Sequence, residues 1–352
     1  MLPGLCLGRY HGGMTESKAM ILGLKGPEIL PEERSFFEAE RPWGFILFSR
    51  NIVDADQLRA LTADLRSIAG DRPLPIFIDQ EGGRVQRLRQ PFAPNYPPGA
   101  RLGDIYRQDR QSGLRAAWLL SRIHAFDLNR FGINADCLPV LDIPVPGSHD
   151  VIGDRAYGTD PVTVAEMGEA AMQGLLAGGV LPVIKHIPGH GRSRGDSHLE
   201  LPVVDESLEE LEATDFKPFA ALNKAPMAMT AHVVYRAIDA DHPATTSRKV
   251  IADIIRGRMG FDSLLMSDDV SMKALAGSFA DRTRAIFAAG CDMALHCNGD
   301  MDEMTAIAAE TPVLEGRPLE RAKAALEGLS YRDDADERAI RDEFEGLTQA
   351  VA

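Results

Sequence analysis

The sequence has 352 residues, with 38 lysines and arginines against 52 aspartates and glutamates, so its formal net charge is −14. A chain of this length forms one large barrel-type domain or two ordinary domains, and its 45% hydrophobic and 26% charged residues are typical of a globular protein. The acidic balance argues against nucleic acid as a partner, because proteins that bind a phosphate backbone usually carry a basic stripe. No apolar run approaches the length of a membrane-spanning helix, which argues against a membrane protein.

The cysteines and the first residues bear on the cellular compartment. The four cysteines show neither a disulfide framework nor a paired CxxC spacing, which favours a reducing compartment. Residues 1–13 hold a short apolar stretch followed by Arg9, too short for a secretory signal. We expect a disordered extension over 1–13, with Met14 as an alternative start, and a single domain over 14–352. A cytoplasmic protein is therefore expected.

Eight short apolar runs, rich in β-branched residues, follow one another along the chain. Unbroken apolarity, rather than alternation, is the mark of strands buried on both faces of a parallel sheet. The predicted strands lie at residues 19–25, 44–49, 74–79, 133–141, 180–185, 227–232, 263–267 and 291–296.

Helical patterns separate these runs. Apolar residues recur at helical spacing after Asp54, where Gln57 is placed to complete a capping box, and again over residues 118–126 and 164–175. Eight strand–helix units over about 300 residues fit a (β/α)8 barrel of the TIM type. A doubly wound sheet with eight strands fits as well, because periodicity does not distinguish the two.

The last part of the chain predicts helices rather than a second domain. Pro318 is expected at a first helical position, and the charge-rich residues 333–345 are expected to form a solvated helix. The chain is thus predicted to be one barrel domain with a C-terminal helical extension.

In such a barrel the active site lies where the strands end, and polar residues gather at those positions in the sequence. Two adjacent carboxylates repel each other, so Asp268 is expected to face the pocket, whereas Asp269 is a candidate helix N-cap. The arginines are either functional or members of rim salt bridges, which contribute little, and His232 is either functional or a buried core residue. The candidates are Asp79, Arg84, Arg87, Arg155, Lys185, His186, His232, Asp268 and His296.

The loop over residues 189–198 is rich in glycine. It lacks both the complete dinucleotide-binding pattern and the GK[ST] of a phosphate loop, so both interpretations are rejected. Asp196 and His198 are two residues apart, and a carboxylate on one imidazole nitrogen fixes the tautomer and favours the protonated ring. Such a pair can act as general acid and then as general base, on a loop able to swing over a bound substrate. A surface pair without a role is the alternative.

Together, residues 79–87, residues 185–191 with Asp196 and His198, and residues 267–272 resemble glycoside hydrolase family 3. The similarity runs in order from about residue 14 to about residue 298 and is closest to the bacterial single-domain β-N-acetylglucosaminidases of peptidoglycan recycling. The resemblance implies a (β/α)8 barrel that removes non-reducing terminal N-acetylglucosamine from β-1,4-linked muropeptides, including species that end in 1,6-anhydro-N-acetylmuramic acid, with retention of configuration.

The resemblance also assigns roles. Asp268 becomes the nucleophile that forms a glycosyl-enzyme intermediate, and His198, partnered by Asp196, becomes the acid/base in place of the second carboxylate that most retaining enzymes use. Arginines and lysines nearby would keep Asp268 ionised. The ligands of the sugar hydroxyls and the acetamido group are then Asp79, Arg87, Arg155, Lys185 and His186.

The expected partner is a small carbohydrate, with no cofactor, no metal and a monomeric protein. The sequence departs from the family pattern at Ile187, where phenylalanine is common, in residues 1–13, which have no counterpart, and in lacking the second domain of some relatives. None of these departures touches a predicted catalytic position.

Three rival functions use the same residues. A Schiff-base enzyme would use Lys185 as its amine but would leave Asp268 and the Asp196–His198 pair without roles. A sugar-binding barrel without catalysis would need only Asp79, Arg87, Arg155 and Lys185. A metal-dependent hydrolase, which would activate a bound water, lacks the HxH motif expected on a first strand. Its ligands would come from His186, His190, His198, His232 and Asp268.

Overall fold

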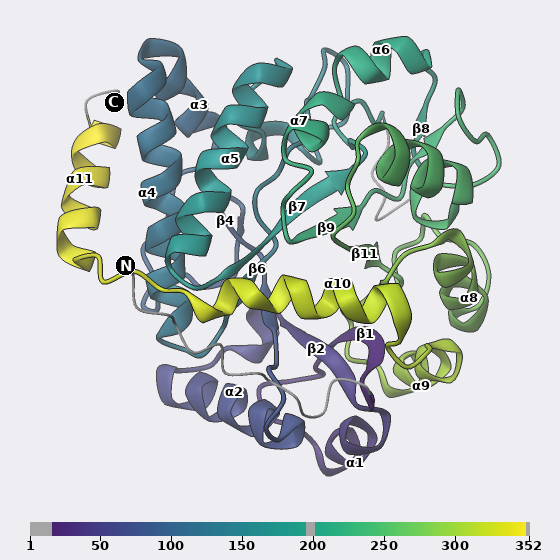
Figure 1. The fold of residues 1–352 in the computed structure, drawn as a ribbon. Coiled ribbons are helices and arrows are strands. Elements are labelled where there is room, and N and C mark those ends of the chain that lie inside the picture. Colours follow the sequence, from purple (N-terminus) through teal and green to yellow (C-terminus); the bar gives the residue numbers. More distant parts are fainter. Residues whose placement is uncertain (1–15, 195–200, 350–352) are drawn as a thin grey trace, which may run out of the picture.

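The computed structural model describes residues 16–194 and 201–349. Within them, eight parallel strands close into a barrel in the order β1-β12-β11-β9-β7-β6-β3-β2, so each strand pairs with its neighbour in the chain. The predicted TIM-type barrel is confirmed, and the doubly wound sheet is wrong (Figure 1). The strands are β1 (Lys18–Gly23), β2 (Pro42–Leu47), β3 (Ile76–Ile78), β6 (Ala135–Asp136), β7 (Leu181–Ile187), β9 (Met227–Thr230), β11 (Leu264–Asp269) and β12 (Met293–His296).

The largest difference from the predicted strands is at β6, where nine residues were expected and two are paired as a strand. Pro139 has no N–H to donate to a ladder, and Val140 resumes the pairing only as an isolated bridge to Lys185. Leu141 N–H then donates to Lys185 O at 2.7 Å. The residues after β6 therefore still run beside β7, which brings Asp142 next to His186.

Side chains spaced two residues apart fill the inside of the barrel. Phe77, Ala135, Val183 and Met229 belong to one buried cluster, as expected for alternate residues of a strand that point to the same face. The residues between them, such as Ile78 and Ile184, pack outwards against the helices. The interior is therefore a packed core, and chemistry is confined to the strand ends.

The helices surround this barrel, as Figure 1 shows. They are α1 (Pro31–Glu40), α2 (Ala55–Ala69), α3 (Gly99–Gln108), α4 (Arg110–Asn129), α5 (Pro161–Ala177), α6 (Leu208–Ala213), α7 (Phe216–Ala221), α8 (Phe279–Ala289) and α9 (Met301–Glu310), with a π-helix over Val250–Arg258. Short 3-10 turns cover Ser49–Asn51, Gly153–Arg155, Ala244–Thr246 and Glu327–Ser330. The expected helices at 118–126 and 164–175 lie within α4 and α5.

Two short pairs of strands lie outside the barrel, one antiparallel and one parallel. Strands β4 (Gln80–Gly82) and β5 (Val85–Gln86) pair antiparallel directly after β3, and β8 (Val203–Val204) pairs with β10 (Val234–Tyr235). In the first turn, Gly82 has φ of 105°, and a Cβ there would lie 2.3 Å from Pro97 O. Only glycine fits this turn, which folds residues 80–87 back over the end of β3.

The start of α2 follows the prediction with one change. The Asp54 carboxylate accepts hydrogen bonds from the N–H groups of Asp56 and Gln57, as an N-cap does. The Gln57 side chain accepts from Val53 N–H at 2.9 Å, one residue before the N-cap. The expected capping box is therefore shifted by one residue, and Gln57 also donates to Pro27 O.

The C-terminal extension closes one end of the barrel and then returns along its side. Helix α10 (Gly316–Leu326) starts before Pro318, which is its third residue rather than its first, and its Ala322 and Ala325 pack on the interior cluster. The helix expected over 333–345 is α11 (Glu337–Gln349), which begins after Asp336 accepts from Arg338 and Ala339 N–H. Figure 1 shows α11 beside α4, where Arg341 pairs with the buried Asp127 at 2.5 Å.

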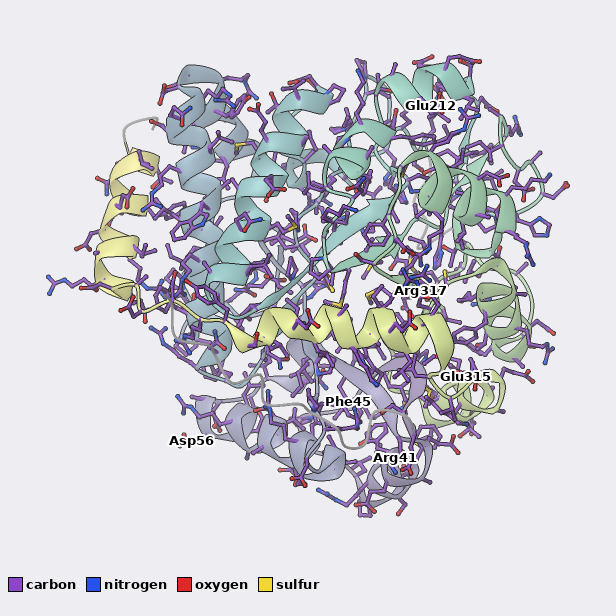
Figure 2. The ribbon with its side chains drawn as sticks, viewed as in Figure 1. Arg41, Phe45, Asp56, Glu212, Glu315 and Arg317 are labelled. Carbon is purple, nitrogen blue, oxygen red and sulfur yellow. The ribbon has the colours of Figure 1, made fainter. Side chains whose placement is uncertain are left out.

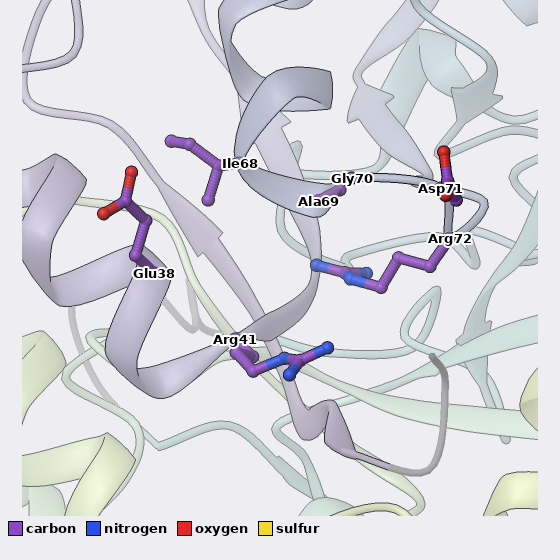
Figure 3. A pocket seen from close by; sticks show the side chains of 7 residues that line it. All are labelled: Glu38, Arg41, Ile68, Ala69, Gly70, Asp71 and Arg72. Carbon is purple, nitrogen blue, oxygen red and sulfur yellow. The ribbon is translucent and has the colours of Figure 1, made fainter. Parts of the chain in front are cut away.

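Charged side chains cover the outer surface, including Asp56, Glu212 and Arg317 (Figure 2). A hollow next to the start of β2 is lined by both signs of charge, with Glu38 and Asp71 beside Arg41 and Arg72 (Figure 3). It lies at the end of the barrel opposite to the carboxyl ends of the strands. Over the described ranges, no helix has the length and apolarity needed to cross a membrane.

Candidate active site

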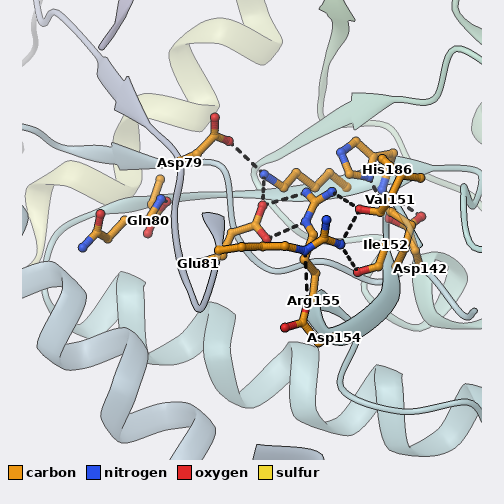
Figure 4. Close-up of polar contacts among 12 residues, drawn as sticks. Asp79, Gln80, Glu81, Asp142, Val151, Ile152, Asp154, Arg155 and His186 are labelled. Carbon is orange, nitrogen blue, oxygen red and sulfur yellow. Dashed lines mark hydrogen bonds and ion pairs between the residues drawn. The ribbon is translucent and has the colours of Figure 1, made fainter. Parts of the chain in front are cut away.

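A network of buried charges occupies the carboxyl ends of β3 and β7. Lys185 Nζ lies 2.9 Å from Asp79 Oδ1 and 2.6 Å from Glu81 Oε1 (Figure 4). Lys185 and Glu81 are both buried. Lys185 is the last inward-facing residue of β7, and Glu81 is carried there by the β4–β5 pair. The lysine therefore joins two carboxylates from the segment that directly follows β3.

Two arginines complete the network. Arg87 donates to Asp79 Oδ2 at 3.0 Å, and its own N–H is fixed by the Gln80 side-chain oxygen. Arg155 contacts Glu81 with both Nε and Nη2, each at 2.8 Å. A bidentate contact of this kind fixes the plane of the guanidinium as well as its position. The two carboxylates and three cations thus form one connected network of ion pairs.

The pKa values show that this unit is ionised at neutral pH. Burial alone would raise the pKa of Glu81, but the charges of Arg155 and Lys185 outweigh burial and lower it to about 2. The pKa of Asp79 is lowered against burial by Lys185 and Arg87. The pKa of Lys185 is raised, because Asp79 and Glu81 outweigh the burial that would lower it. Fixed, fully charged donors and acceptors are suited to hydrogen-bonding the hydroxyls of a sugar.

The protonated state of Lys185 bears on the Schiff-base alternative. An amine that attacks a carbonyl must lose its proton, and such lysines have lowered pKa values. Lys185 has a raised pKa and two carboxylate partners. The network therefore favours a binding role for Lys185.

Next to the network, Asp142 organises two histidines. Asp142 Oδ2 lies 2.7 Å from His186 Nδ1, and Oδ1 accepts from the N–H groups of His186 at 3.2 Å and His190 at 2.6 Å. Burial would raise the pKa of Asp142, but His186 lowers it to about 2. Because the carboxylate accepts from Nδ1–H, Nε2 is the ring nitrogen of His186 that is left for a ligand.

The carboxyl group of Asp136, on β6, stays neutral. It is fully buried, and its Oδ1 accepts from Gln80 N–H at 2.9 Å. Burial raises its pKa well above the usual value. Among the described residues its Oδ2 has no hydrogen-bond partner. A protonated Asp136 supports the start of β4 without adding a third negative charge beside Asp79 and Glu81.

Asp268 lies at the end of β11, across the barrel mouth from the charged network. Its Oδ1 accepts the N–H of Asp269 at 2.8 Å. Burial first, and then the charges of Asp269, Asp79 and Asp268, raise the pKa of the Cys297 thiol. Asp79 follows β3 and Asp268 lies near the end of β11, so both are at the carboxyl-end face of the parallel barrel.

Asp269 has a different role from its neighbour. Its carboxylate accepts from Ser271 N–H, from Ser271 Oγ and from Cys297 N–H at 3.1 Å. Helix α8 is capped instead by Ser278. Asp269 thus caps a turn after β11 rather than the helix that was expected.

The structure brings some of the sequence-predicted residues together and separates others. The structure brings Asp79, Arg87, Arg155 and Lys185 into one network, with His186 beside it and Asp268 opposite. Arg84 holds the loop before Arg155 through the carbonyls of residues 150–152. His296 is buried and pairs with Glu303 at 2.6 Å. Asp196 and His198 lie outside the described residues.

Glu81 and Asp142 were not predicted as site residues, although both organise the site. Each follows a barrel strand within a few positions, so the same strand-end rule pointed to them. In the part of the chain that the structure describes, no three histidine, cysteine, aspartate or glutamate side chains are arranged to hold a metal ion.

Comparison with known proteins shows the family of this chain. Residues 20–325 match the profile of the glycosyl hydrolase family 3 N-terminal domain. A β-hexosaminidase of Chromobacterium violaceum is 38% identical over 336 residues, which cover 94% of this chain and 93% of that protein.

Solved structures are similar to this chain over most of its length. NagZ from Neisseria gonorrhoeae in complex with N-trifluoroacetyl-D-glucosamine superposes with a TM-score of 0.82 at 32% identity, covering 96% of this chain and 97% of that one. The β-N-acetylglucosaminidase from Thermotoga maritima superposes with a TM-score of 0.73 at 28% identity, covering 92% of this chain and 68% of that one. The chain therefore belongs to glycosyl hydrolase family 3.

Proposed function

We propose that this glycoside hydrolase, a β-N-acetylhexosaminidase, removes non-reducing terminal N-acetylglucosamine from β-1,4-linked muropeptides, including those that end in 1,6-anhydro-N-acetylmuramic acid. The reaction proceeds with retention of configuration through a covalent intermediate on Asp268. Cell-wall recycling in the cytoplasm, by a monomer whose single catalytic domain spans 14–352, is part of the same proposal.

The observation that carries the proposal is the paired charge network at the same end of the barrel as Asp268. Lys185, Arg87 and Arg155 supply donors there, and Asp79 and Glu81 supply acceptors. A sugar ring offers both kinds of group on every face, so a site with fixed donors and acceptors orients it. Asp268 lies on β11, a different strand of the same barrel, and its Oδ1 accepts from Asp269 N–H.

Two steps follow from these roles. In the first, the Asp268 carboxylate bonds to the anomeric carbon while the bond to the leaving oxygen breaks, and His198 gives that oxygen its proton. In the second, His198 takes a proton from water, and the water oxygen replaces Asp268 at the anomeric carbon. A histidine as acid/base leaves Asp268 as the anion that faces the reacting carbon.

The first experiment is hydrolysis of a chromogenic N-acetyl-β-glucosaminide with and without EDTA, beside the matching β-glucoside. We expect turnover of the first substrate alone, unchanged by EDTA. Loss of turnover to EDTA would support the metal-dependent alternative, and binding without turnover would support the sugar-binding alternative.

The assigned residues are tested by substitution. Asp268→Asn should abolish turnover while sparing binding. His198→Ala should lose much less activity on substrates with a good leaving group than on natural disaccharides, because a good leaving group does not need the acid. Equal losses on both kinds of substrate would contradict the role of His198.

A further inference from the structure

His232 sits at the end of β9, beside the strand that carries Asp268, and the proposed reaction gives it no role. Its side chain is fully buried. Both ring nitrogens have partners, since Nδ1 lies 2.7 Å from Thr245 Oγ1 and Nε2 lies 3.0 Å from Asp269 O. One of these partners belongs to the residue next to the proposed nucleophile.

The partners fix the tautomer of His232. A carbonyl oxygen only accepts, so Nε2 carries the hydrogen in the contact with Asp269. Burial lowers the pKa of His232, although the nearby charge of Asp268 opposes this. The ring is therefore neutral, and Nδ1 is an acceptor at 2.7 Å from the Thr245 hydroxyl, which also lies 3.1 Å from Ala231 O. Thr245 Oγ1 is in turn 2.8 Å from Thr230 Oγ1, which can donate to it.

The series of hydrogen bonds through Thr245 and His232 ends at Asp269, whose N–H, carboxylate and carbonyl all have partners. The Asp269 N–H donates to Asp268 Oδ1, and the Asp269 carboxylate accepts from Ser271 and Cys297. Its carbonyl accepts from His232. The Asp268 carboxylate is bonded to the Asp269 N–H, so a shift of the Asp269 backbone moves one of the donors that hold Asp268.

We propose that His232, held by Thr245, is a positioning residue that fixes the Asp269 backbone and thereby aims the Asp268 carboxylate at the reacting carbon. This inference rests on the proposed nucleophilic role of Asp268. Misplacement of a reacting atom by about 1 Å costs on the order of a hundredfold in rate, so a lost bond at Asp269 O is expected to lower kcat without changing substrate binding.

Two substitutions of similar size separate the positioning role from simple packing. In His232→Gln the amide nitrogen falls near the position of Nε2 and still donates to Asp269 O. In His232→Asn the shorter amide reaches Thr245 but not Asp269. We expect about a hundredfold loss of kcat for His232→Asn and less than about tenfold for His232→Gln, with little change in KM on a chromogenic N-acetyl-β-glucosaminide.

A second pair tests the donor to Nδ1 in case both histidine variants fold poorly. Thr245→Val keeps the side-chain shape and removes the hydroxyl, whereas Thr245→Ser keeps the hydroxyl and removes a methyl group. We expect Thr245→Val to lose kcat several-fold and Thr245→Ser to stay near the parent enzyme. The thermal midpoints of all four variants identify any loss of kcat that results only from a less stable protein.

The nucleophile itself is tested separately, by adding azide to Asp268→Ala. Formation of the α-glycosyl azide would support Asp268 as nucleophile, because azide then enters from the vacated face. With that result, equal kcat losses for the two histidine variants, or losses that track the thermal midpoint, would overturn the role of His232 alone. Failure of azide to restore turnover would overturn the nucleophile and the positioning role together.

Discussion

Glu81→Gln is the substitution that most directly tests the charged network. The amide keeps the size of the side chain and removes only its charge. Glu81 is buried, accepts two bonds from Arg155 and contacts Lys185 at 2.6 Å. After the change Arg155 faces a neutral group, and Lys185 retains only Asp79 as its carboxylate partner.

The size of the effect follows from the pKa of Glu81, which is lowered from 4.5 to about 2. One pKa unit corresponds to about 1.4 kcal/mol, so the ionised side chain stabilises the fold by about 3 kcal/mol at pH 7. Removing one partner of a buried ion pair costs about 3–5 kcal/mol in other proteins. We therefore expect Glu81→Gln to lower the free energy of unfolding by about 3 kcal/mol.

The loss should depend on pH with a definite sign. A carboxyl group with a lowered folded-state pKa contributes its full stability above the unfolded-state value, here 4.5, and loses it as the pH falls towards 2. The difference between the parent protein and Glu81→Gln is therefore full at pH 7 and less than half as large at pH 3. Urea unfolding followed by tryptophan fluorescence at both pH values measures it.

A matched control is available at the surface. Glu343 makes the same bidentate contact with Arg115, at 2.7 Å, but both side chains are 43% exposed. Exposed pairs contribute about 0–1 kcal/mol, so Glu343→Gln should change the free energy of unfolding by less than 1 kcal/mol. Equal losses for the two variants, or a loss for Glu81→Gln that is the same at pH 3 and pH 7, would refute the electrostatic account.

Three further predictions test other parts of the site. Asp136→Asn should raise the thermal midpoint at pH 7. Above pH 3.8, the usual pKa of the group, the acid is ionised in the unfolded chain and must take up a proton on folding, which the amide does not need to do. Calorimetry should show this gain in the midpoint vanish below about pH 4. Asp142→Asn should lower kcat/KM on a chromogenic N-acetyl-β-glucosaminide at least tenfold, since bonds to a charged group contribute about 1.5–3 kcal/mol; an unchanged value would mean that His186 needs no orienting carboxylate. In Gly191→Ala the new Cβ would lie 2.1 Å from Ile143 O, so a loss of about 3 kcal/mol is expected on urea unfolding, against little change in Gly26→Ala, where nothing lies within 4 Å.

Much of the site could be predicted because the carboxyl ends of all the strands of a parallel barrel lie at the same end of the barrel. Asp79, Lys185 and Asp268 each close an apolar run, and parallel strands bring all such ends to one face. The motifs shared with glycosyl hydrolase family 3 then supplied roles that strand ends alone do not. The eight strands were likewise predictable, because burial on both faces requires unbroken apolar runs.

The sequence by itself determined the eight buried strands and most of the polar side chains at their ends, since these depend on local hydrophobicity, and its motifs pointed to the family and so to the barrel. Only the tertiary structure decided which charges pair, because pairing depends on how the turns after the strands fold back. Glu81 joins Lys185 and Arg155 through the β4–β5 turn, Asp142 reaches His186 because Pro139 interrupts β6, and His232 reaches Asp269 because β9 and β11 are neighbours. The tertiary structure also decided the charge state of the buried carboxyl groups. Asp136 is neutral while Asp79 and Glu81 are ionised, because only the latter two have cations within hydrogen-bonding distance.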